Sequence, residues 1–148
     1  MKAVAYEVRP EDEIRDLIES WRKAAEAKDI DAILSHYVPD IVAFDAIAQL
    51  RFRGRDAYRK HWEACLSMCP GQMIFEVHDL NIAAGDDLAF CHSLSLCGGT
   101  GENGEEKTGW MRATAGCRKI DGKWMIVHEH FSAPFDMESG KALFDLQP

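Results

Sequence analysis

The chain has 148 residues, of which 47% are hydrophobic and 28% charged, and its formal net charge is −8. This length and composition predict one soluble globular domain that spans residues 1–148. The negative charge, uninterrupted by any Lys/Arg cluster, argues against binding to nucleic acid or to an anionic membrane surface. No apolar run approaches the ~20 residues that a membrane span requires.

The cysteines and the start of the sequence indicate a cytoplasmic protein. The five cysteines are odd in number and include no CxxC pair, which favours reduced thiols over a disulfide framework. Charged residues occur too early in the chain for a signal peptide. We therefore expect a cytoplasmic location.

The first part of the chain predicts two helices and a short strand. Pro10 can begin the first helix, because its missing N–H is not needed there, and the acidic residues after it suit the helix dipole. Asp29 can cap a second, short helix that carries Tyr37 on its apolar face and ends at Pro39. A short strand is then expected over residues 41–44.

A third helix follows this strand. Asp45 ends the strand, and Gly54 marks the turn that precedes the helix. The apolar stripe of the helix includes Tyr58 and Trp62, and Pro70-Gly71 terminates it.

The second half of the chain has the pattern of a β-meander. Apolar alternation predicts four strands, over residues 73–82, 88–97, 107–120 and 123–131. Asp121-Gly122 between the last two is a strong hairpin signal, because both residues tolerate positive φ. Helices followed by long strands indicate the α+β class: a cone-shaped, curved antiparallel sheet with the three helices packed on its concave face and a ligand cavity at its mouth.

The last predicted strand carries an unusual carboxylate. Alternation of side chains places Val127, Glu129 and Phe131 on one face of this strand, and His128 and His130 on the other. A glutamate flanked on its own face by Val and Phe indicates either an acid that faces a pocket or a salt bridge to an arginine of the same sheet.

Two stretches of the chain resemble a known superfamily. The segment Ala-Lys-Asp-Ile-Asp-Ala-Ile at 27–33, with Asp45 sixteen residues after Asp29 and Gly54 nine residues later, resembles ketosteroid-isomerase-like and SnoaL-like domains of the nuclear transport factor two superfamily. The segment 118–134 is similar to the association domain of calcium/calmodulin-dependent protein kinase. The resemblance covers nearly the whole chain and implies the cystatin-like α+β fold.

The resemblance also implies which residues form the site. Asp45 takes the place of the general-base aspartate of the isomerases, and Glu129 becomes a second carboxylate in the same cavity that could act as its partner acid. A turn-capping role is the plainer alternative for Asp45. The implied ligand-binding residues are Trp21, Tyr37, His61, Trp62, Ser93, Met111, Val127 and Phe131.

Departures from the isomerase pattern argue against steroid isomerisation. Trp21 stands where the oxyanion-hole tyrosine is expected, and Trp62 stands where its supporting tyrosine is expected. The second residue of that hole, an aspartate, is replaced near Ala115 or Gly116. An indole N–H donates one hydrogen bond but cannot shuttle a proton.

The face of the sheet that points away from the cavity has a separate predicted role. His128 and His130 share this face with Trp110 and Arg112, and the resemblance implies a homodimer through it. A metal site completed by His92 is the alternative that the residues alone allow. We expect no metal ion and no cofactor.

The expected function is that of a ketosteroid-isomerase-like protein that binds a small, largely apolar molecule. It would be a cofactor-independent enzyme that uses a cavity carboxylate for proton transfer in isomerase-, cyclase- or lyase-like chemistry. Two alternatives remain open: a non-catalytic ligand-binding or oligomerisation module, and a hydrolase of a small catabolic intermediate.

Overall fold

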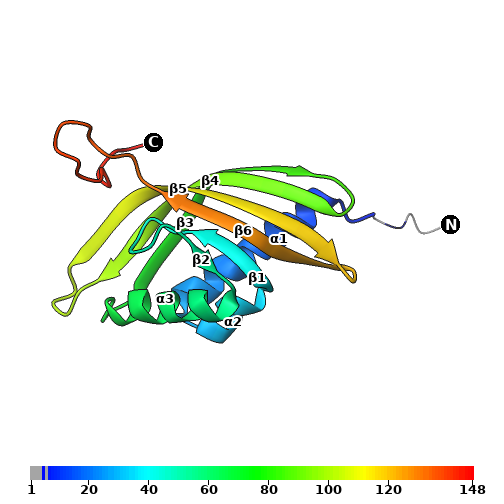
Figure 1. Ribbon diagram of the computed structural model, residues 1–148, viewed down its shortest axis with the longest axis horizontal. Helices are drawn as coiled ribbons and strands as arrows, with labels where there is room; N and C mark the ends of the chain where they lie inside the picture. Colours follow the sequence, from blue (N-terminus) through cyan, green and yellow to red (C-terminus); the bar gives the residue numbers. More distant parts are fainter. Residues whose placement is uncertain (1–4, 6) are drawn as a thin grey trace.

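The computed structural model describes Ala5 and residues 7–148, and Figure 1 shows helices gathered on one side of a curved sheet. The elements follow in the order α1 (Pro10–Glu26), α2 (Ile30–Ser35), β1 (Tyr37–Phe44), β2 (Phe52–Arg53), α3 (Arg55–Ser67), β3 (Met73–Ala84), β4 (Leu88–Thr100), β5 (Glu106–Ile120) and β6 (Lys123–Ser132). The strands form one unclosed sheet with the order β2-β1-β6-β5-β4-β3. The predicted α+β architecture is confirmed.

The four long strands pair as the sequence predicts. β3 to β6 form an antiparallel meander, and both residues of the Asp121-Gly122 turn have positive φ, 51° and 79°. One edge differs from the expected antiparallel sheet, because β1 lies parallel to β6 with Ala43 opposite Glu129. A parallel pair is possible here because a long crossover rather than a tight turn connects the two strands.

The second helix is shorter than predicted. Asp29 caps α2 and accepts a hydrogen bond of 3.1 Å from the Ala32 N–H, but the helix ends before Tyr37, which begins β1. Pro39 therefore lies inside a strand, between Tyr37 and Val42, where the pairing with β6 is irregular. Proline is tolerated at such a place because no ladder hydrogen bond is required of its nitrogen.

A β-bulge in β6 decides which of its side chains face the helices. Two consecutive residues of β5 pair with His128 and Ile126, so Val127 between them has no partner. Ile126 is buried, Val127 and His128 are half-buried, and Glu129 is buried again. The predicted alternation is therefore wrong at Val127, because the bulge adds a residue that a strict period of two does not allow for.

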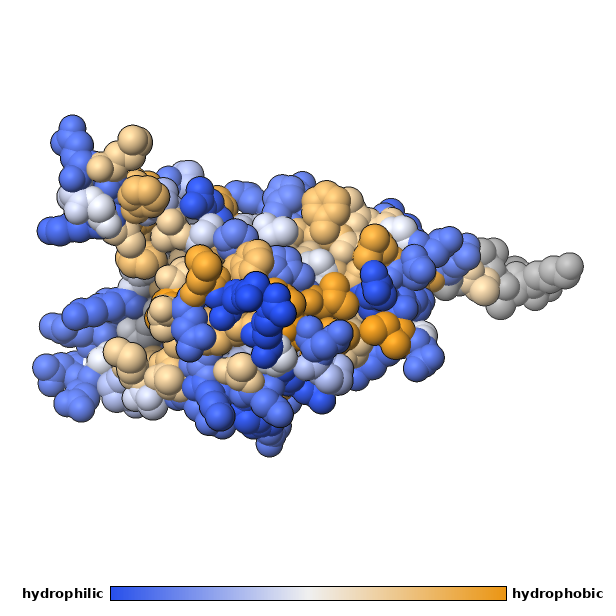
Figure 2. Space-filling view, in the orientation of Figure 1, coloured by the Kyte–Doolittle hydropathy of each residue, from blue (hydrophilic) through white to orange (hydrophobic). Residues whose placement is uncertain are grey.

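After β6 the chain turns back on itself and packs against β5. Phe135 forms an isolated bridge with Ala142, and the Trp110 N–H donates a hydrogen bond of 3.0 Å to the Phe144 carbonyl. Apolar side chains of this tail remain exposed: Phe135, Met137, Phe144 and Leu146. Figure 2 shows apolar side chains among hydrophilic ones at the end of the molecule that carries the C-terminus. No helix among the described residues is both long and apolar enough to cross a membrane.

Candidate functional site

The Glu129 carboxyl lies at the centre of a buried hydrogen-bond network. β6 holds Glu129 on the concave face of the sheet, where only 4% of the residue is exposed. Its Oε1 accepts a hydrogen bond of 2.5 Å from the Tyr37 hydroxyl and one of 2.8 Å from the Tyr58 hydroxyl. The Tyr37 oxygen in turn accepts a hydrogen bond of 2.7 Å from the Trp21 indole N–H. Side chains from α1, β1, α3 and β6 thus meet around one carboxyl group.

This environment brings the carboxyl close to its titration point at neutral pH. Burial raises the pKa of Glu129 to about 7; hydrogen bonds from Tyr37 and Tyr58 oppose this rise, and the negative charge of Asp45 adds to it. Burial and the charge of Glu129 hold the pKa of both tyrosines well above the usual value. The tyrosines therefore remain proton donors, while Glu129 can gain or lose a proton.

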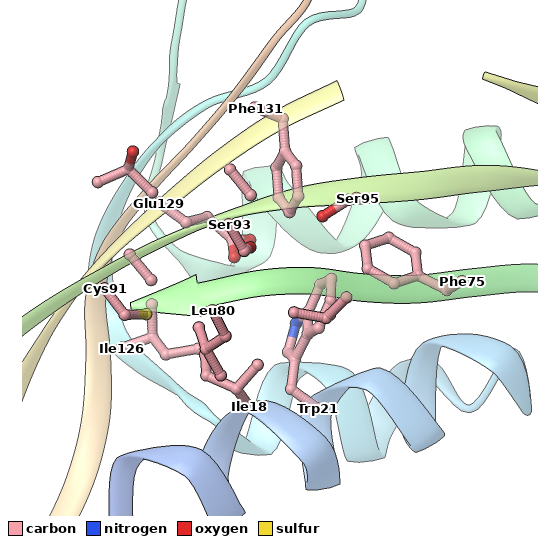
Figure 3. Close-up of a pocket in the computed structure, with 14 residues that line it drawn as sticks. Ile18, Trp21, Phe75, Leu80, Cys91, Ser93, Ser95, Ile126, Glu129 and Phe131 are labelled. Carbon is pink, nitrogen blue, oxygen red and sulfur yellow. The ribbon is translucent and has the colours of Figure 1, made fainter. Parts of the chain in front are cut away.

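Glu129 lines a small cavity between α1 and the sheet, which we call the inner cavity (Figure 3). Its volume is about 30 Å³, enough for one or two water molecules. Ser93 and Ser95 also line it, and the hydroxyl of Ser95, a residue only 1% exposed, has no hydrogen-bond partner among the described residues. The lining is completed by Ile18, Trp21, Phe75, Val77, Leu80, Cys91, Ala113, Thr114, Ala115, Ile126 and Phe131.

Asp45 combines the two roles that the sequence left as alternatives. Its Oδ1 accepts a hydrogen bond of 3.1 Å from the Ile47 N–H, which caps the turn after β1. The same oxygen lies 3.4 Å from His61 Nε2, and the Asp45 side chain is only 12% exposed. His61 is itself buried and stacks on Phe52 with ring centroids 4.2 Å apart. An acid–imidazole pair therefore lies at the end of β1.

Asp45 and His61 line a second cavity of about 120 Å³, which we call the outer cavity. Glu129 and Asp45 line different cavities, not the single cavity that was expected, and the rings of Phe75 and Phe131 form a wall that the two cavities share. Trp21 packs against both rings, with centroids 4.9 and 6.0 Å away, and so extends this aromatic wall. The two acids remain electrostatically linked, since the charge of Asp45 raises the pKa of Glu129.

The structure distributes the predicted ligand-binding residues over several places. Trp21, Ser93 and Phe131 line the inner cavity, whereas His61, Trp62, Met111 and again Phe131 line the outer one. Tyr37 lines neither cavity but holds Glu129 from the side. Val127 also lines neither, because the bulge gives its expected place to Ile126.

Tyr58 is a site residue whose role the sequence pattern did not reveal. Tyr58 was assigned only to the apolar stripe of the third helix. A buried tyrosine hydroxyl needs a hydrogen-bond partner, so a tyrosine in an otherwise apolar stripe is itself a signal of a buried acceptor. The identity of that acceptor, 71 residues away in the chain, is not visible in the sequence.

The convex face uses its histidines in local contacts. His128 Nδ1–H donates a hydrogen bond of 2.5 Å to the Val42 carbonyl, and the Phe44 ring packs edge-on against the rings of both His128 and His130. Arg112 donates a hydrogen bond of 3.2 Å to Ser132. Within residue 5 and residues 7–148, no cluster of three or more His, Cys, Asp or Glu side chains is arranged to hold a metal ion. In the same part of the chain, Glu129 forms no ion pair with an arginine.

Comparison with known proteins places this geometry in a family. Residues 14–136 match the family model described as a SnoaL-like domain. The chain belongs to the SnoaL-like family. A solved NTF2-like protein of unknown function from Pseudomonas putida KT2440 is 52% identical to this SnoaL-like protein, with a TM-score of 0.87, and the match covers 93% of this chain and 96% of that one.

More distant structures share only the fold with this SnoaL-like protein. A protein of unknown function with a cystatin-like fold from Nostoc punctiforme is 18% identical, with 85% and 93% of the two chains covered and a TM-score of 0.71. The association domain of CaMKII from C. elegans is 19% identical, with 82% and 94% covered and a TM-score of 0.69. No curated protein shows significant similarity to the chain.

Proposed function

We propose that this SnoaL-like protein is a cofactor-independent enzyme that binds a small, largely apolar molecule and moves a proton with Glu129. The observation that carries this proposal is the buried Glu129 carboxyl, held at Oε1 by two tyrosine hydroxyls, with its pKa raised to about 7. A group whose pKa lies near the working pH can both take and return a proton in one reaction.

The roles of the surrounding groups follow from their positions. Tyr37 and Tyr58 fix Oε1, whereas Oε2 accepts no hydrogen bond from the described residues and is the oxygen available to a ligand. Asp45 and His61 form a second proton-handling pair at the outer cavity. The chemistry supported best is removal of a proton from an acidic C–H, as in an isomerase, cyclase or lyase. The same carboxylate could instead activate a water molecule, as a hydrolase would require.

Exchange of carbon-bound protons tests this proposal without knowledge of the natural substrate. Acetone, which is about the size of the two water molecules that the inner cavity can hold, exchanges its α-protons slowly in D₂O, and ¹H NMR follows the loss of their signal. We expect the wild type to accelerate this exchange, with a rate that rises through about pH 7 as Glu129 loses its proton. Glu129→Gln should exchange at the buffer rate, because the amide cannot accept the proton.

A matched control separates the role of Glu129 from a general effect of lost charge. Glu63 lies on α3 and is exposed, so Glu63→Gln removes one carboxylate outside both cavities and should leave the exchange rate unchanged. Exchange by folded Glu129→Gln at the wild-type rate would contradict the proposal.

We also propose that the protein is a cytoplasmic homodimer that pairs through the convex face of the sheet, with Trp110, Arg112, His128 and His130 at the interface. Two observations support this: the helices cover only the concave face (Figure 1), and an association domain shares the fold. The five free cysteines fit a reducing compartment.

Size-exclusion chromatography with light scattering should give twice the chain mass, and His130→Glu should give monomers. A monomeric wild type would contradict the dimer, and a large ring would favour an assembly role.

A further inference from the structure

The outer cavity has the size and the lining of a site for one aromatic ring. Its volume of about 120 Å³ is comparable to the ~150 Å³ of an engineered apolar cavity that binds benzene. Three aromatic side chains form part of its wall, namely those of Trp62, Phe75 and Phe131. Four sulfur-containing side chains form much of the remainder: those of Cys65, Met73, Cys97 and Met111. Sulfur atoms make favourable contacts with the edges of aromatic rings.

The two thiols in this lining are neutral. Burial raises the pKa of Cys97 to about 12, and burial together with the charge of Asp45 raises the pKa of Cys65. No lysine or arginine lines the outer cavity. The polar groups of its lining residues are these weakly polar thiols, the Asp45–His61 pair and the Trp62 indole N–H, which has no hydrogen-bond partner among the described residues.

Asp45 sets which polar group a bound ring can carry. Both contacts of the Asp45 carboxyl, with the Ile47 N–H and with His61, are made by Oδ1, so Oδ2 is not engaged by the described residues. A carboxylate oxygen in an apolar cavity accepts a hydrogen bond from a hydroxyl or amino group. It repels a second carboxylate, because that charge would lose its hydration with no cation to replace it.

The outer cavity adjoins a larger, open groove. An open groove of about 490 Å³ runs along the end of α3 and the glycine-rich end of β4. The outer cavity and this groove share the side chains of Ile47, Trp62, Cys65 and Met73. The groove therefore adjoins the outer cavity at these four side chains and not at the aromatic wall in front of Glu129.

We propose that the outer cavity binds a single neutral aromatic ring that carries a hydrogen-bond donor, such as a phenol, with the donor directed at Asp45 and the ring seated among the four sulfur side chains. This ring site goes beyond the proposed function, because the aromatic wall lies between it and Glu129. The binding itself does not require Glu129.

Binding of phenol, benzene and benzoate to the full chain tests this site by ligand-observed NMR and titration calorimetry. We expect saturable binding of phenol, weaker binding of benzene and at least about tenfold weaker binding of benzoate, since one unfavourable charge contact is of that order. Asp45→Asn should reduce the preference for phenol over benzoate, because it removes both the charged acceptor and the repulsion.

Filling the cavity provides a second, independent measurement. Cys65→Phe places a ring in the cavity and should abolish phenol binding, whereas Ala64→Phe, the neighbouring exposed position on α3, should leave it intact. If Cys65→Phe does not fold, Met111→Trp fills the same cavity from β5 and replaces it in the comparison. Unchanged phenol affinity in a folded cavity-filled variant, or no saturable phenol binding to the wild type, would overturn the proposal.

The outcomes separate this inference from the proposed function. Glu129→Gln should bind phenol like the wild type even though it no longer exchanges ketone protons. If exchange survives in Glu129→Gln, the proton-transfer role fails and the ring site stands. If phenol does not bind while exchange depends on Glu129, the ring site fails and the proton-transfer role stands.

Discussion

Glu129 has no fixed charge at neutral pH, because two opposing effects act on one side chain. Burial favours the neutral acid, and the hydroxyls of Tyr37 and Tyr58 favour the carboxylate. Both hydroxyls donate hydrogen bonds to the same oxygen, Oε1, so the acid is held in one orientation in either charge state. A carboxyl that is oriented but free to change its charge suits proton transfer better than a permanently ionised one.

The titration of Glu129 predicts how stability depends on pH. Its pKa is about 7 in the folded protein and 4.5 when solvated, so the folded state binds the proton more tightly. Stability should therefore fall as pH rises from about 4.5 to about 7, and this group contributes a loss of ~3 kcal/mol. Urea unfolding at pH 5 and pH 8 measures this. In Glu129→Gln the difference in unfolding free energy between the two pH values should shrink by most of that amount, and an equal difference in both proteins would contradict the assigned pKa.

Substitution of Asp45 by asparagine should change activity without a comparable change in stability. Asparagine retains an Oδ1 that can accept the Ile47 N–H, so Asp45→Asn should melt within a few degrees of the wild type. The variant lacks the charge that faces His61 and that raises the pKa of Glu129, so the rise of ketone exchange with pH should move to a lower pH than in the wild type. Thermal melting and the NMR exchange assay report the two quantities. Wild-type exchange in this variant would remove Asp45 from the mechanism.

At the scale of the elements, the features that local sequence determines were predicted correctly. The meander, the Asp121-Gly122 turn and the cap at Asp29 depend on neighbours in the chain, and all three are confirmed. Tyr37 was misplaced because it fits both the apolar face of a helix and the start of a strand. Val127 was misplaced because the bulge arises in the pairing with β5. Neither the partner of Tyr58 nor the aromatic wall between the acids can be found without the tertiary structure.

Removal of the Asp29 cap of α2 should lower the stability of the protein only modestly. α2 has only six residues, so the hydrogen bond from Ala32 N–H to Asp29 satisfies one of the few free donors at its start. Asp29→Ala should lower the free energy of unfolding by about 1 kcal/mol, measured in urea, whereas Asp29→Asn should stay close to the wild type because asparagine also caps. Equal losses in both variants would indicate that the charge of Asp29, not its cap, matters.

At the scale of the whole molecule, the tail after β6 packs on β5 at Gly109, a position without a side chain. A Cβ on Gly109 would lie 2.8 Å from the Phe144 Cβ, closer than side chains tolerate. The tail and the segment after β1 together border an open groove of about 500 Å³ that reaches Asp45. The position of the tail therefore affects one approach to the site.

Gly109→Ala should loosen the tail without unfolding the sheet. The added methyl group displaces Phe144, and such overpacking costs about 1–3 kcal/mol at the contact. Limited proteolysis should then cut the segment after residue 134 faster than in the wild type. Gly116→Ala is the matched control on the same strand, because its new Cβ would meet nothing closer than 3.8 Å. Equal cutting rates in all three proteins would show that the contact does not hold the tail.

The bulge at Val127 has a consequence for the evolution of this gene. Trp124 and Ile126 face inward before it, and Glu129 and Phe131 face inward after it, so the bulge absorbs one residue without turning the acid outward. Loss of that single codon would restore ordinary alternation and still leave the glutamate pointing into the protein. Lineages with and without the extra residue can therefore share the same buried acid, and an alignment of them should show a one-residue gap here beside an unchanged glutamate.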